Sequence, residues 1–125
     1  MNKFKNAISW FEIPVTNFER ALTFYNKIFD YDMYTQKMGP HMMGFFPCEK
    51  DGLSGAIVHG EGCIPSKTGT CVYLNGGDNL NNILDKVEEA GGKIAVKKTL
   101  ITNEIGYFAI FIDTEGNKVA LHSLH

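Results

Sequence analysis

The chain repeats one order of structural elements twice, and this duplication restricts the fold of its 125 residues more than any other feature. Two segments are predicted to be amphipathic helices, because apolar residues recur in them three and four positions apart. The first follows the capping residue Asn17, and the second begins near Asp78 or Asn79 and stops at Gly91 and Gly92. One strand-like run precedes each helix and three follow it, which gives the order βαβββ twice.

The predicted strands are rich in aromatic and β-branched residues. They cover residues 7–15, 31–38, 42–46 and 54–59 in the first half, and residues 70–75, 93–101, 106–112 and 118–123 in the second. The turn from Asp113 to Gly116 is expected to give Gly116 a positive φ. Residues 60–69 are the expected linker. We therefore predict a single domain, 1–125, with modules at about 7–59 and 69–124.

The two halves also match in detail, with Ala56–His59 corresponding to Val119–His122 at an offset of 63 residues. A single four-stranded module with one helix would leave one face of its sheet uncovered. We therefore predict an α+β fold in which the two modules form a curved, eight-stranded mixed sheet. The helices are expected on the outside, and the concave face is the expected ligand-binding cup.

Composition excludes several classes of protein. The formal net charge of −2 and the 44% hydrophobic content exclude a disordered chain and disfavour a nucleic-acid partner. No apolar stretch approaches the length of about 18 residues that crosses a membrane. Three cysteines without a C-x-x-C pair favour a reducing compartment. We expect a cytoplasmic protein whose partner is a small molecule, with no nucleic acid and no membrane.

Three segments resemble the vicinal oxygen chelate superfamily, which includes glyoxalase I, extradiol dioxygenases and bleomycin-resistance proteins. They are Ile13–Ala21 followed by Phe24 and Tyr25, then Ala90–Lys93, and finally Phe111–Asn117, where Thr114 replaces the usual proline. The resemblance covers nearly the whole chain and implies the same duplicated fold. It also implies a homodimer, because modules of this family commonly pair within or between chains.

Members of that family that use a divalent metal hold it with side chains from the first and last strands of each half. The resemblance places these positions at Trp10, at or beside Thr70, at Ile57 and at Ala120. These residues offer no imidazole or carboxylate, so we expect no metal and no cofactor. The same positions, with Val72, are expected to line a mostly apolar ligand-binding pocket.

Glu12, His59 and His122 lie two residues beyond three of these positions and therefore on the same strand faces. Two alternatives follow. In the favoured one the protein binds a small organic molecule without a metal; His59 contacts the ligand, and Glu12 and His122 are the candidate acid/base pair if a reaction occurs. In the other, the three side chains hold a metal in a lyase or dioxygenase of the lactoylglutathione lyase type. A structural role is the plainer alternative for each of them.

Overall fold

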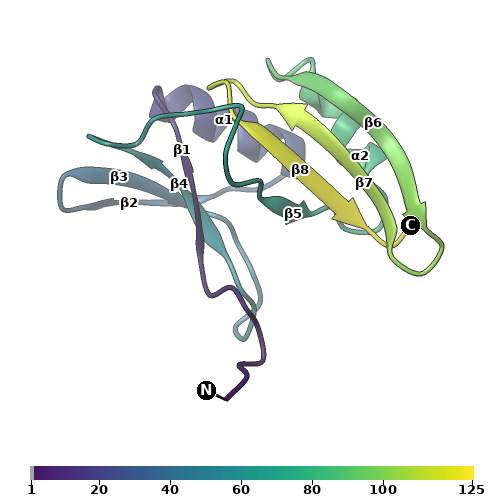
Figure 1. Ribbon diagram of the computed structural model, residues 1–125. Coiled ribbons are helices and arrows are strands. Elements are labelled where there is room, and N and C mark those ends of the chain that lie inside the picture. The colour runs from purple at the N-terminus through teal and green to yellow at the C-terminus, as the bar shows by residue number, and fades with distance from the viewer. Residues whose placement is uncertain (1) are drawn as a thin grey trace.

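The computed structural model describes residues 2–125, and its elements follow the βαβββ order twice (Figure 1). The first module comprises β1 (Phe11–Pro14), α1 (Phe18–Phe29), β2 (Tyr34–Met38), β3 (His41–Phe45) and β4 (Gly55–His59). The second comprises β5 (Tyr73–Asn75), α2 (Asn81–Val87), β6 (Lys93–Thr102), β7 (Gly106–Ile112) and β8 (Lys118–Ser123). The α+β class and the two modules are confirmed.

The strands form two four-stranded sheets, in the orders β1-β4-β3-β2 and β5-β8-β7-β6. In each sheet the first strand runs parallel to the last strand of its module, and the other pairs are antiparallel. Strand pairing therefore stops between the modules, where the expectation was one eight-stranded sheet. The break falls between the edge strands β1 and β5.

Helix α1 begins where the sequence predicts, because the Oδ1 atom of Asn17 accepts the N–H of Arg20 at 3.1 Å. Helix α2 is shorter than predicted and ends at Val87. A tighter turn follows it, since the N–H of Gly91 donates to the carbonyl of Glu88, three residues back. Its N-cap is Leu80, and the Oδ1 atom of the preceding Asn79 accepts the N–H of Asn81 at 2.9 Å.

One hydrophobic core lies between the two helices and one face of both sheets. Its largest fully buried side chains include Tyr25, Phe24 and Phe111, whose rings pack edge to face or tilted against one another. In Figure 1 both helices lie behind the sheets. The opposite face of each sheet, which we call the helix-free face, is left uncovered by helices.

Two predicted strands begin later than expected. Residues 7–10 and 70–72 lie outside β1 and β5, and residues 2–10 form an exposed segment that leads away from the sheet in Figure 1. For β1 the reason is the length of the partner strand, because β4 begins at Gly55, which pairs with Phe11. Within residues 2–125, no helix is both long and apolar enough to span a membrane.

Candidate ligand-binding site

An aromatic row crosses the helix-free face of the first module. The rings of Trp10 and Phe45 are 6.1 Å apart, and the ring of Tyr34 stacks on Phe45 at 6.0 Å and 25°. Trp10 and Tyr34 remain 43% and 67% exposed. We call these three residues the aromatic row; it lies at the surface rather than in the core.

Small and aliphatic side chains lie beside the aromatic row. Met43, Ala56 and Val58 are buried and form a separate small cluster, against which Phe45 packs. Pairing of β3 with β4 fixes this arrangement, because Phe45 lies opposite Ala56 and Met43 opposite Val58. The cluster gives the aromatic row a fixed apolar support.

A cavity of about 250 Å³ lies at the break between the two sheets. Three predicted site residues, Glu12, Thr70 and Val72, line it together with Lys118. Glu12 follows Trp10 by two residues, so this cavity continues the face that carries the aromatic row. The cavity is near the lower limit of volume for a small-molecule site, and it combines apolar walls with one carboxylate and one ammonium group.

The structure corrects the placement of Ile57. This side chain is fully buried in the main core beneath helix α1, where it cannot face a ligand on the helix-free face. The sheet pairings explain the difference: Ile13 pairs with Ile57 in one module, and Leu74 pairs with Leu121 in the other. The modules therefore correspond at an offset of 64 residues in their last strands. A shift of one residue moves a side chain to the opposite face.

Ala120 and His122 lie on the helix-free face of the second module. Ala120 is fully buried and pairs with Tyr73 and Ile110. The Nε2 atom of His122 donates a hydrogen bond to the carbonyl of Ile105 at 2.6 Å, which ties the imidazole to the turn between β6 and β7. His122 does not line the cavity that contains Glu12.

His59 is at the exposed end of β4, and its Nδ1 atom donates to the carbonyl of Val15 at 3.1 Å. Glu12, His59 and His122 thus come from three different strands and have separate surroundings. Among residues 2–125, no three His, Cys, Asp or Glu side chains are grouped so that they could hold a metal ion. The donor sets considered above therefore do not fit a divalent metal ion.

The turn between β7 and β8 joins the modules behind the cavity. Asn117, which is 5% exposed, lines the cavity and donates from Nδ2 to the carbonyl of Pro14 at 2.7 Å and to Asp113 at 3.0 Å. Its Oδ1 atom accepts the N–H of Ser66 from the linker at 3.0 Å. One buried amide therefore fixes β1, the linker and β8 around the cavity.

Glu115 in the same turn closes the start of helix α1. Its carboxylate accepts the N–H groups of Thr16 and Asn17 and the guanidinium of Arg20, at 2.6–3.1 Å. Burial alone would raise the pKa of Glu115, but the hydrogen bonds from Arg20, Asn17, Thr114 and Thr16 outweigh it and lower the pKa to about 2. The carboxylate is therefore charged at neutral pH and holds the two modules together.

Comparison with known proteins shows the family of the chain. The profile of the glyoxalase/bleomycin resistance protein/dioxygenase superfamily matches residues 7–121. A glyoxylase-like domain-containing protein from Didymella fabae is 31% identical over 122 residues, which cover 91% of each chain. The protein therefore belongs to the glyoxalase/bleomycin resistance protein/dioxygenase superfamily.

Solved structures share the fold at lower identity. A glyoxalase/bleomycin resistance protein from Streptomyces sp. CB03234 is 20% identical with a TM-score of 0.70, over 92% of this chain and 98% of the other. The antibiotic-binding protein TnmS3 from the same organism is 19% identical with a TM-score of 0.61, over 97% and 98%. A glyoxalase I mutant from Zea mays is 16% identical with a TM-score of 0.67 over 93% of this chain, which spans only 45% of the maize chain.

Sequence reasoning missed Tyr34 as a candidate site residue. The signal was present in the turn at Gly39 and Pro40, because a hairpin centred there pairs Met38 with His41 and, four residues further out, Tyr34 with Phe45. The sequence around Phe45 does not show whether this side chain belongs to the core or to the wall of a pocket. Only the pairing shows that three aromatic side chains share one face.

Proposed function

We propose that the protein binds a flat, largely apolar organic molecule on the helix-free face of its first module, without a metal ion. The aromatic row carries this proposal. The rings lie about 6 Å apart, and those of Trp10 and Tyr34 are exposed, so they offer a stacking surface outside the core. Glu12, in the adjoining cavity, is proposed to contact a polar edge of the ligand.

A binding role is favoured over a reaction. The candidate acid/base residues Glu12 and His122 do not line a common cavity, and Nε2 of His122 is engaged by the carbonyl of Ile105. Of the proteins with the same fold, TnmS3 is an antibiotic-binding protein, whereas the maize protein is a glyoxalase I. TnmS3 supports a binding function for this chain. Both proteins have low sequence identity to this chain, so what they share with it is the fold.

The aromatic row is tested with a matched pair of compounds, 2-naphthol and its saturated analogue trans-decahydro-2-naphthol. The chain has one tryptophan, so its indole N–H gives a single side-chain resonance that reports on Trp10. We expect 2-naphthol to shift this resonance and to bind at least about fivefold more tightly than the saturated alcohol, because only a planar ring stacks. Equal affinity for the two compounds would contradict the proposal.

Variants of the aromatic row sharpen the same test. Tyr34→Leu keeps an apolar side chain but removes one ring, and it should lower the affinity for 2-naphthol about fivefold. Tyr73→Leu changes a tyrosine that is 56% exposed and lies outside both the aromatic row and the cavity at the break, and it serves as the control, since it should leave the affinity within about twofold. Loss of binding in the control alone would place the ligand elsewhere.

We further propose that the protein is a homodimer in the cytoplasm. Exposed apolar side chains on the segment before β1, among them Phe4 (76% exposed) and Ile8, offer a surface for a second copy. Cys48, Cys63 and Cys71 are all free thiols, which agrees with a reducing compartment. Sedimentation equilibrium of the full chain tests the dimer, and a single monomeric species at about 100 µM would reject it.

A further inference from the structure

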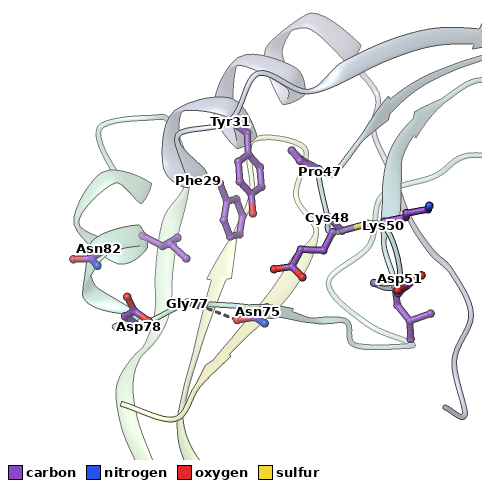
Figure 2. Close-up of a pocket in the computed structure, with 15 residues that line it drawn as sticks. Phe29, Tyr31, Pro47, Cys48, Lys50, Asp51, Asn75, Gly77, Asp78 and Asn82 are labelled. Carbon is purple, nitrogen blue, oxygen red and sulfur yellow. Dashed lines mark hydrogen bonds between the residues drawn. The ribbon is translucent and has the colours of Figure 1, made fainter. Parts of the chain in front are cut away.

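A second, larger cavity lies on the helix side of the molecule. It has a volume of about 900 Å³ and is bounded by the end of helix α1, the loop 47–53 between β3 and β4, and the segment 75–83 that leads from β5 into α2 (Figure 2). We call it the helix-side cavity. None of its lining residues lines the cavity between the sheets or belongs to the aromatic row.

Two stacked rings form one wall of the helix-side cavity. Phe29 and Tyr31 lie 5.4 Å apart with an interplanar angle of 12°, and both project from the end of α1 into the space that Figure 2 shows. Phe29 also packs edge to face on Phe46, which is 8% exposed. The pair is therefore anchored to the core while Tyr31 stays 37% exposed.

The backbone holds Tyr31 in this position. Asp30 adopts φ 56° and ψ 47°, and within residues 2–125 it is the only residue other than glycine with a positive φ. The N–H of Tyr31 donates to the carbonyl of Asn26, and the side chain of Asn26 accepts the N–H of Met33. A ring that is fixed before binding loses little conformational entropy when a ligand stacks on it.

The remaining walls carry an excess of negative charge. Glu49 and Asp51 come from the loop 47–53, and Asp78 comes from the opposite side, before α2. Lys50 is the only cation among the lining residues. Figure 2 shows the two rings between Asp78 on one side and Asp51 on the other, so a ligand on the rings would lie within the field of carboxylates from both sides.

We propose that the helix-side cavity is a second binding site, for a small organic cation that carries an aromatic ring. The ring of the ligand stacks on Tyr31 and Phe29, and its ammonium or amidinium group faces Asp78 or Asp51. Aromatic faces and carboxylates both favour a cation over a neutral molecule or an anion. This site is independent of the function proposed for the aromatic row.

The test compares 2-naphthylmethylamine, which is a cation at pH 7, with the neutral 2-naphthylmethanol. Binding is followed by the backbone amide resonances of the full chain. We expect shifts at residues 29–31, 47–53 and 75–83, with at least about fivefold tighter binding of the amine. Equal affinity of the two compounds, shifts confined to the aromatic row, or no shifts at 10 mM amine would each overturn the proposal.

Variants separate the contribution of the carboxylates from that of the aromatic rings. Asp51→Asn combined with Asp78→Asn should reduce the preference for the amine to about twofold or less, because it removes charge without removing the rings. Tyr31→Leu should weaken both compounds about fivefold. All three side chains are exposed, so the fold is expected to tolerate these changes. Tyr73→Leu, at an exposed tyrosine that lines neither cavity, is the control, and an equal loss in that variant would contradict stacking on Tyr31.

Discussion

The two module boundaries of this molecule differ, although the modules share one order of elements. At the start of α1, the five-residue turn 113–117 of the second module supplies Glu115 to the first turn of the helix and Asn117 to β1. At the start of α2, the corresponding loop of the first module runs from residue 46 to residue 54. It supplies no comparable side-chain hydrogen bond to the helix. The helix-side cavity lies there instead.

This difference shows that one module boundary of a duplicated fold can stabilise the structure while the other remains available for binding. Buried and satisfied polar groups fix one boundary, and that boundary sets the position of β1 and therefore of Trp10 and Glu12. The other boundary has exposed loop residues, and its helix has only 7 residues. We call the boundary at the start of α1 the closed boundary and the boundary at the start of α2 the open boundary. We expect substitutions at the closed boundary to change stability, and substitutions at the open boundary to change only binding.

The largest effect is expected for Asn117→Ala. The substitution removes three side-chain hydrogen bonds, to Pro14, Ser66 and Asp113, and takes this partner away from the carbonyl of Pro14 and the N–H of Ser66. We expect a loss of about 3 kcal/mol in the free energy of unfolding, measured by urea denaturation. Asn82→Ala at the open boundary is the matched control and should not lower stability. Equal losses in the two variants would remove the distinction between the boundaries.

The second-largest effect is expected at low pH, where protonation of Glu115 should weaken the closed boundary. The pKa of Glu115 is about 2 in the folded protein, below its ordinary value of 4.5, so its contribution is complete above about pH 4.5 and is lost as the pH falls toward 2. We expect Glu115→Gln to cost roughly 2 kcal/mol at pH 7 and to flatten the acid limb of the stability profile. Glu49→Gln, in the loop of the open boundary, should leave that profile unchanged. A wild-type acid limb in Glu115→Gln would refute this role.

The smallest effect at the closed boundary concerns Tyr25. Its hydroxyl donates to Asp113 at 2.7 Å within the core, and Tyr25→Phe should cost about 1 kcal/mol. Burial, followed by the negative charge of Asp113, raises the pKa of Tyr25 well above its ordinary value. Alkaline titration of the 5 tyrosines should therefore leave one phenol protonated until the protein unfolds. Ionisation of all of them in the folded state would contradict this.

Local sequence signals predicted much of the fold. The cap at Asn17 and the ranges of β7 and β8 agree with the sequence, and Gly116 adopts φ 93° as expected. These features depend on residues that are close along the chain. The division of the modules at residues 60–69 remains a prediction.

The candidate site was harder to predict because it depends on register between distant strands. Correspondence by sequence placed Ile57 with Ala120, whereas the sheet pairings place Ile57 with Leu121, on the helix side. The gap between the sheets was not visible either, since no local pattern shows whether β1 and β5 pair. The roles assigned to Trp10, Glu12, Thr70 and Val72 remain proposals.

The most direct test of the proposed function is to titrate the Trp10 indole resonance with 2-naphthol before and after exhaustive dialysis against EDTA. The donor sets on the strands do not form a metal site, so the dissociation constant should agree within about twofold in the two samples. Loss of binding after dialysis, with recovery on addition of a divalent metal ion, would contradict metal-free recognition by the aromatic row.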